Sequence, residues 1–327
     1  MGKSMALFLR DGGLSLSETS IQRFYWRIAL ELKLRKSSGD AFQDFFCAMM
    51  AKAHSDDFVR VRPFGKLGDK GCDGYLQSNG QVFQCYGALD GGSDGKVAYL
   101  IRKMGEDYAK ALKQIADIMK EWHMAHNFVD GLPTEAILEL DKLRKANETR
   151  KFGFISMEGF AERIFALDVA SIEELLGPAA TAKDAQNLQP SELRDLVAGV
   201  AAAADIVQSN LDPIKPVPLE KLVFNKLPGH WHALISGGWQ NAHLVGKYLG
   251  RHHDTLIGEK IAKIFRDRYQ YLRAQNLSPG AIMSALYEMV AGIGNVAPGR
   301  QVAAQSLLAF LFESCDIFED QPPKANS

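Results

Sequence analysis

The sequence predicts an α/β N-terminal domain, with a mixed sheet of about five strands flanked by helices, followed by an all-α C-terminal domain. Three observations support this division. Short strand-like runs joined by a hairpin signal fill residues 58–87. Helical and strand-like segments then alternate from residue 97 to residue 176. Beyond residue 221, every periodic segment has helical spacing.

The N-terminal domain is predicted from the order of its periodic segments. Phe24, Ile28 and Leu32 recur at helical spacing, and Asp40 is placed to cap the next helix. Residues 1–20 are polar and glycine-rich and are expected to form a flexible N-terminus. In chain order, the expected elements are helix 21–36, helix 41–54, strand 58–62, strand 72–76, strand 82–86, helix 97–122, strand 123–129, helix 133–146, strand 151–157 and helix 160–176.

The C-terminal half is predicted to consist of helices separated by segments of small and polar residues. Ser191 and the Ser278-Pro279 pair are helix-start signals. The expected elements are a linker at 178–190, a helix from 191, a proline-rich link at 211–218, one turn at 221–227, and helices at 229–249, 255–275, 278–290 and 300–318. The predicted domain limits are 1–20 (flexible N-terminus), 21–180 (α/β domain), 181–220 (helical linker), 221–320 (helical domain) and 321–327 (disordered tail).

Bulk composition narrows the class of protein. The 327 residues suffice for two domains, and 46% hydrophobic with 24% charged residues is ordinary for a folded chain. A net charge of −1 excludes a globally basic protein, so DNA contact would need a local patch or partner subunits. Four cysteines without a C-x-x-C pair favour reduced thiols over disulfides or a zinc site. No leader-like or membrane-length apolar run occurs, so a cytoplasmic location without a membrane span is expected.

A β-hairpin at residues 72–86 is the segment on which the functional interpretation depends. Asn79-Gly80 is a strong hairpin signal. As a two-residue turn it would pair Ser78 with Gln81, and side chains would then alternate between the two faces. One face is expected to carry Asp73, Tyr75, Gln84 and Tyr86, and the other Phe83 and Cys85. In the strand before it, Val59 and Val61 are expected on an apolar face and Arg60 and Arg62 on a basic one.

This hairpin resembles the PD-(D/E)xK nuclease motif, in which an Asp on one strand faces a Glu or Gln and then a Lys two residues apart on the next. Asp73 and Gln84 match the first two positions, but Tyr86 stands where the Lys belongs. The resemblance implies a restriction-endonuclease-like fold in which Asp73 and Gln84 hold Mg²⁺ through oxygen atoms. A helical Glu of that fold is replaced by Gln43. The active site is therefore expected to be degenerate.

Several residues near the motif have candidate roles. Lys70, in the loop before Asp73, could replace the missing lysine, and Tyr86 could bind a water or stack on a base. Contacts with DNA are expected at Arg60, Arg62 and Lys66. The alternative to a nuclease site is an ordinary hairpin that packs under a helix and has no catalytic role.

Most of the chain resembles subunits of the ABC-ATPase three-component systems of bacteria, the Lamassu-like antiphage class. The resemblance rests on R-V-R-P-F-G-K-L-G-D-K-G-C-D-G-Y-L and V-F-Q-C-Y-G at the front, and on G-W-Q-N-A-H-L-V and L-L-A-F-L-F-E-S-C-D-I-F-E at the back. It implies that the chain is the nuclease-type effector subunit of an antiphage or anti-plasmid defence complex. The implied partners are an SMC- or Rad50-like ATPase and a small middle subunit, with DNA as the target. Self-association into a homo-oligomer is left open.

Two functions remain open from the sequence. The first is a Mg²⁺-dependent DNA endonuclease, with Asp73 and Gln84 as ligands and Lys70 as the substitute activator. The second is a catalytically inactive nuclease-fold module for nucleic-acid binding or assembly, which the loss of the motif Lys and of the helical Glu favours.

Other polar clusters are expected to be structural. The pairs His230/His232 and His252/His253, together with His123 and His126, are interpreted as packing or surface residues because neighbouring acids at metal-ligand spacing are lacking. The basic residues of helix 97–122 are interpreted as a solvated face, with phosphate binding as the alternative; they are Arg102, Lys103, Lys110 and Lys113.

Overall fold

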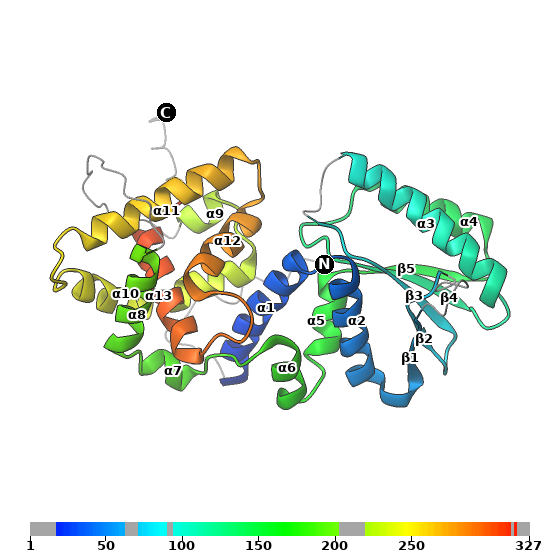
Figure 1. The fold of residues 1–327 in the computed structure, drawn as a ribbon, viewed down its shortest axis with the longest axis horizontal. Helices are drawn as coiled ribbons and strands as arrows, with labels where there is room; N and C mark the ends of the chain where they lie inside the picture. Colours follow the sequence, from blue (N-terminus) through cyan, green and yellow to red (C-terminus); the bar gives the residue numbers. More distant parts are fainter. Residues whose placement is uncertain (1–17, 63–70, 90–93, 203–219, 315–316, 319–327) are drawn as a thin grey trace.

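The computed structural model of the protein describes residues 18–62, 71–89, 94–202, 220–314 and 317–318. One lobe holds a β-sheet covered by helices, the other consists of helices, and α1 (Glu18–Lys36) lies between them (Figure 1). The predicted helix 21–36 is thereby confirmed. In the described ranges, no helix is both long enough and apolar enough to cross a bilayer.

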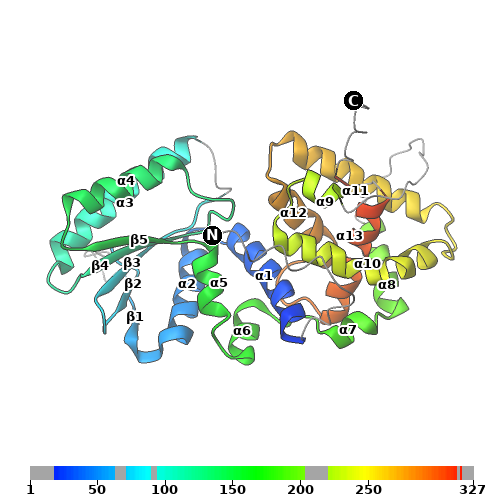
Figure 2. The ribbon, with the colours of Figure 1, turned by 180° about the vertical axis from the view of Figure 1, so that it is seen from behind.

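The sheet is mixed and has five strands, as the sequence predicts. Its order is β1-β2-β3-β4-β5, with antiparallel pairing from β1 to β3 and parallel pairing from β3 to β5. The strands are β1 (Phe58–Arg60), β2 (Gly74–Leu76), β3 (Gln81–Tyr86), β4 (Glu121–His126) and β5 (Lys151–Ile155). One face is covered by α2 (Gly39–His54) and α5 (Met157–Ile164), and the other by α3 (Asp94–Ile115) and α4 (Thr134–Ala146), as Figures 1 and 2 show.

Side-chain alternation along β3 divides the core of this lobe into two layers. Phe83 and Cys85 join the cluster on the α2 side, where the rings of Phe46 and Phe83 lie 5.5 Å apart. Val82 and Tyr86 join the cluster on the α3 side. The predicted separation of Phe83 and Cys85 from Tyr86 is therefore confirmed. In and after β1 the predicted apolar face is right for Val61, which packs against the α3-side cluster, but wrong for Val59, which is 40% exposed; Phe58 is buried on the α2 side.

The connection between β2 and β3 differs from the predicted two-residue turn. Leu76, not Ser78, pairs with Gln81, so four residues form the turn. The N–H of Gly80 donates to the carbonyl of Leu76 (3.0 Å), and the Asn79 side chain accepts from the N–H of Gln81 (3.0 Å). These local bonds close a wider turn than a type I′ hairpin. Because pairing slips by two residues, Tyr75 keeps its predicted place on the face of Tyr86. The same prediction is wrong for Asp73, whose carboxylate bonds Gln43 on the α2 side.

We expect Gly80→Ala to lower the free energy of unfolding by about 1–2 kcal/mol, since Gly80 has a left-handed φ of +72°. Its added Cβ would also lie 2.7 Å from the carbonyl oxygen of Ile118. Gly105 in α3 is the matched control, because a Cβ there meets no atom within 4 Å. Gly105→Ala should stabilise the protein by about 0.5–1 kcal/mol through helix propensity. Urea unfolding measures the stability of both variants. Equal changes in the free energy of unfolding would contradict the role given to Gly80.

Two predicted helices end earlier than their spacing suggests. Helix 97–122 ends at Ile115, and the chain turns so that the N–H of Lys120 donates to the carbonyl of Gly80 (2.9 Å) and begins β4. Trp122 keeps helical spacing but is buried by the strand. Helix 160–176 is two helices, α5 and α6 (Val169–Leu176), because Asp168 caps α6 by accepting from the N–H of Ser171 (3.0 Å).

The second lobe is built around α13, which is buried on nearly all sides. Its helices are α7 (Ala182–Gln186), α8 (Pro190–Ala202), α9 (Glu220–Phe224), α10 (Gly229–Leu249), α11 (Ile257–Ala274), α12 (Pro279–Ala291) and α13 (Pro298–Glu313). Gly238 lets α10 approach α13 closely, since a Cβ there would lie 2.7 Å from that of Ala309. Helix α8, within the predicted linker 181–220, packs against α11, α12 and α13. Of the termini expected to be flexible, residues 1–17 and 321–327 lie outside the described ranges, whereas residues 18–20 form the first turn of α1, so that part of the expectation is wrong.

Candidate functional site

Asp73 lies just before β2 and is 4% exposed. Its Oδ2 accepts a hydrogen bond from the backbone N–H of Cys85 (2.7 Å) on β3. Its Oδ1 accepts from the amide nitrogen of Gln43 (2.7 Å) on α2. The structure therefore brings together Asp73 and Gln43, two residues that the sequence singled out separately. Both oxygens of the carboxylate are used to hold β2, β3 and α2 together.

Gln84 is 2% exposed and lies on β3 next to Cys85. It alternates with Phe83 and Cys85, so its side chain shares the α3 side of the sheet with Val82 and Tyr86. Within the described residues, its Oε1 is buried and has no hydrogen-bond partner. Asp73, by contrast, is bonded from the α2 side. The two predicted ligands are thus neighbours along the sheet, but they are engaged from different sides.

Tyr86 occupies the position of the motif lysine and is 7% exposed. Its ring stacks on Phe128, with centroids 5.9 Å apart and planes at 10°, and it also lies near Tyr99. Desolvation raises the pKa of its hydroxyl, so the group stays neutral. Packed in this way, Tyr86 has a structural role and supplies no cation.

The residues present do not fit a Mg²⁺ ion. Magnesium requires several oxygen ligands in octahedral geometry. Within the described residues, the carboxylate of Asp73 already accepts two N–H bonds, and the amide of Gln43 presents its nitrogen to it. Among the described residues, no group of three or more acids, histidines or cysteines could hold a metal ion.

The predicted DNA-binding residues are only partly described. Arg60 forms an ion pair with Asp44 of α2, and Arg62 is exposed. Lys66 and Lys70 lie outside the described residues. On α3, Asp107 binds both Lys103 (2.7 Å) and Lys110 (3.1 Å), while Arg102 pairs with Glu106. The exposed Arg102–Glu106 pair favours the solvated-face interpretation of α3, whereas Lys103 and Lys110 are engaged by Asp107, which is 2% exposed.

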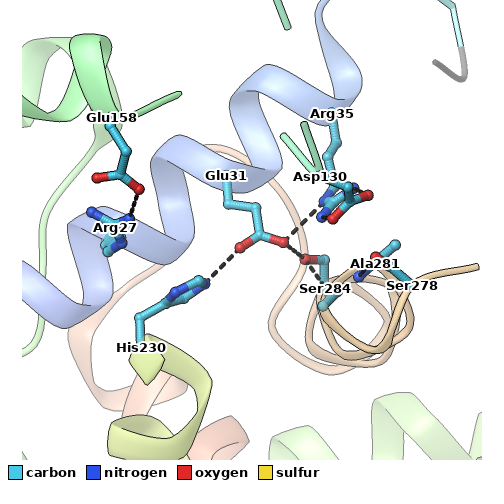
Figure 3. Close-up of polar contacts among 10 residues, drawn as sticks. Arg27, Glu31, Arg35, Asp130, Glu158, His230, Ser278, Ala281 and Ser284 are labelled. Atoms are coloured by element: carbon cyan, nitrogen blue, oxygen red, sulfur yellow. Dashed lines mark hydrogen bonds and ion pairs between the residues drawn. The ribbon is translucent and has the colours of Figure 1, made fainter. Parts of the chain in front are cut away.

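A buried polar cluster on α1 was not predicted from the sequence. Glu31 is 1% exposed and lies between the two lobes (Figure 3). Its carboxylate binds His230 of α10 (2.6 Å) and Nε of Arg35 (2.9 Å), and it accepts from the hydroxyl of Ser284 of α12. Arg35 in turn makes two 2.8 Å bonds to Asp130, which follows β4 in the sheet lobe. We call these five residues the Glu31 cluster.

The Glu31 cluster is electrostatically favourable despite its burial. Burial alone would raise the pKa of Glu31, but the hydrogen bond from His230, the charge of Arg35 and the hydrogen bond from Ser284 lower it below its usual 4.5. The charge and hydrogen bonds of Arg35 likewise lower the pKa of Asp130 against the effect of burial. Glu31 therefore carries a charge that is fully paired. The cluster fixes α10 and α12 to α1, and α1 to the sheet lobe.

The remaining histidines are consistent with the structural interpretation. His232 contacts the carbonyl of Leu222 (3.2 Å), and the rings of His252 and His253 lie 4.1 Å apart in the segment after α10. His126 is buried in β4, and desolvation lowers its pKa to about 4. A neutral imidazole at this depth belongs to the core of the sheet lobe.

Comparison with known proteins finds a match in the helical half. Residues 191–319 match the family model of C-terminal domain 10 of the ABC-three component (ABC-3C) systems. The match covers less than half of the chain and begins within α8. No curated protein and no solved structure is significantly similar to the chain. The match supports the prediction that the chain is one component of such a system.

Proposed function

We propose that the chain is a catalytically inactive assembly subunit of an ABC-3C defence complex. In this proposal, the sheet lobe keeps the layout of a restriction-endonuclease-like domain as a structural module. The helical lobe binds the partner subunits, an SMC- or Rad50-like ATPase and a small middle subunit, in a cytoplasmic complex that acts on DNA. The observation that carries the proposal is that both oxygens of Asp73 accept hydrogen bonds from the protein itself.

The neighbours of Asp73 support this view. A phosphodiesterase of this type needs ligands open to a metal and a cation near the attacking water. Gln43 supplies a donor to Asp73 where that fold has a carboxylate. The tyrosine at the lysine position is stacked in the core. Each departure converts a catalytic position into a packing or hydrogen-bonding position.

The helical lobe supports an assembly role. It carries the part of the chain that matches the ABC-3C domain. A single hydrophobic cluster extends from the α2 side of the sheet through α1 into α13, and it includes Phe46, Leu30 and Leu308. Together with the Glu31 cluster, this core joins the lobes into one body. Such a body holds the sheet lobe in a fixed position relative to the partner-binding helical lobe.

The test is a phage challenge of cells that carry the complete system with Asp73→Asn. Asparagine keeps the shape and the acceptor for the N–H of Cys85 but cannot support metal catalysis. We expect protection within about twofold of the wild type. Asp44→Asn, which removes an exposed acid of α2, is the matched control. Loss of protection by Asp73→Asn alone, with the assembled complex intact, would contradict the proposal.

A Mg²⁺-dependent endonuclease is the second candidate, and one observation favours it. The oxygen of Gln84 is buried without a partner among the described residues, as an amide oxygen prepared for a cation would be. The purified complex incubated with DNA and Mg²⁺ or Mn²⁺ decides between the candidates. Cutting that disappears in Asp73→Asn would support the second candidate and refute the first.

A further inference from the structure

A groove of about 590 Å³ crosses the helical lobe between the start of α8 and the C-terminal half of α10. Its floor is apolar and includes Leu188, Leu193 and Leu244. Only Leu193 of these three is fully buried, so the floor is open at the surface. The volume lies in the range of sites that accept several side chains.

The rim of this groove is basic. Lys247 lies in the last turn of α10 and Arg251 in the turn that follows the helix, and both are exposed. In the part of the chain that the structure describes, neither forms an ion pair. Arg194, on the opposite wall, is paired with Asp195 (2.9 Å), and the nearby Asp254 binds Lys260 (2.7 Å). The rim therefore carries two positive charges, those of Lys247 and Arg251, that form no ion pair with any described residue.

We propose that this groove docks an amphipathic segment of a partner subunit, with aliphatic side chains on the floor and acidic side chains against Lys247 and Arg251. The inference rests on the proposed assembly function and names its contact surface. The groove lies almost wholly within the domain that matches the ABC-3C model. A helix that places apolar anchors in a groove and charges at its edge is a recurrent mode of recognition. Complementary charge at the rim would set the orientation and speed of association.

The floor fits a protein segment better than a nucleic acid. Single-stranded nucleic acids bind on aromatic faces that stack with bases. The rings that line this groove are packed on one another: Tyr248 lies edge-to-face against His252, with centroids 5.9 Å apart and planes at 61°, and the ring of His252 lies 4.1 Å from that of His253. The aliphatic floor offers no stacking platform. Lys247 and Arg251 are also too few to follow a phosphate backbone.

The first experiment co-expresses the full chain with the ATPase and the middle component and measures the complex by size-exclusion chromatography with light scattering. The variant Lys247→Glu/Arg251→Glu should weaken the complex about tenfold. Lys142→Glu/Lys145→Glu on α4 makes the same charge change at two exposed lysines and should leave assembly unchanged. Unchanged assembly by the groove variant would overturn the proposal. Loss of self-association of the isolated chain, in place of loss of partner binding, would assign the groove to a second copy and also overturn it.

The second experiment separates the groove from the proposed function. Fluorescence anisotropy is measured with a helical peptide carrying leucines at helical spacing and glutamates elsewhere, with its lysine counterpart, and with single-stranded DNA. The glutamate peptide should bind the wild type about tenfold more tightly than the groove variant. Equal binding to both proteins, or preference for the lysine peptide or the DNA, would overturn the docking proposal. A wild-type chain that elutes apart from its partners would refute the assembly function, while the peptide still tests the groove.

Discussion

Glu31→Ala is expected to lower the free energy of unfolding by about 3 kcal/mol, because it leaves buried donors from three elements without their acceptor. His230 and Ser284 lose their bond to α1. Arg35 keeps its two bonds to Asp130, which limits the loss. The measurement is urea unfolding followed by tryptophan fluorescence, since Trp26 and Trp231 are buried in α1 and α10.

The matched control is Glu158→Ala. Glu158 also pairs with an arginine of α1, Arg27, but its side chain is 66% exposed. Its loss should cost under about 1 kcal/mol, as for other surface ion pairs. Equal effects of the two substitutions would show that the Glu31 cluster does not hold the lobes together.

The pH dependence gives an independent check on Glu31. Its pKa is lowered in the folded protein, so the group stabilises the fold at pH values above its usual 4.5. This stabilisation is lost as the pH falls through the lower, folded-state pKa. The difference in stability between wild type and Glu31→Ala should therefore shrink as the solution is acidified below pH 4.5. A constant difference across this range would contradict the charged state assigned to Glu31.

The layers of the fold could be predicted from the sequence, because the local periodicity of apolar residues indicates which face of each helix or strand is buried. On β3, the faces of Phe83 and Tyr86 were right although the register was wrong, since the slip of two residues preserves alternation. The end of α3 was missed because Met119 and Trp122 continue its spacing while belonging to a turn and a strand. Periodicity cannot distinguish these cases when both place the side chain in the core.

The Glu31 cluster shows what local patterns leave out. The partners of Glu31 on α10 and α12 are 199 and 253 residues away, so no spacing rule connects them. One signal was available: Glu31 follows Ile28 by three residues and lies on the apolar stripe of its helix. An acid on such a stripe requires a buried partner. The sequence could have identified Glu31, although not His230 or Ser284.

Asp73 was identified from the sequence, but its hydrogen bonds were not. The motif directs attention to Asp73 and Gln84 as a pair, whereas the structure pairs Asp73 with Gln43. The side chain that replaces a carboxylate on α2 is the one that satisfies Asp73. A motif read along the chain could not reveal this contact, because it depends on how α2 packs on the sheet.

Asp73→Ala is accordingly expected to lower the free energy of unfolding by about 3 kcal/mol, because it leaves the buried N–H of Cys85 and the amide of Gln43 without an acceptor. Asp73→Asn should cost about half as much, since it keeps one acceptor oxygen. Removal of a catalytic acid usually leaves the free energy of unfolding unchanged or raises it. If Asp73 were such an acid, Asp73→Ala would therefore not destabilise the protein.

A double-mutant cycle with Gln43→Ala gives the decisive measurement. If Asp73 and Gln43 act as a structural pair, the two substitutions should be non-additive, with a coupling of about 1–2 kcal/mol in urea unfolding. Asp73 with Asp44→Ala, an exposed acid on the same helix, is the control pair and should be additive. If the effects of Asp73→Ala and Gln43→Ala were additive, and the Asp73→Ala protein were more stable than the wild type, the result would support a catalytic role for Asp73. Non-additivity would place it among the residues that hold α2 to the sheet.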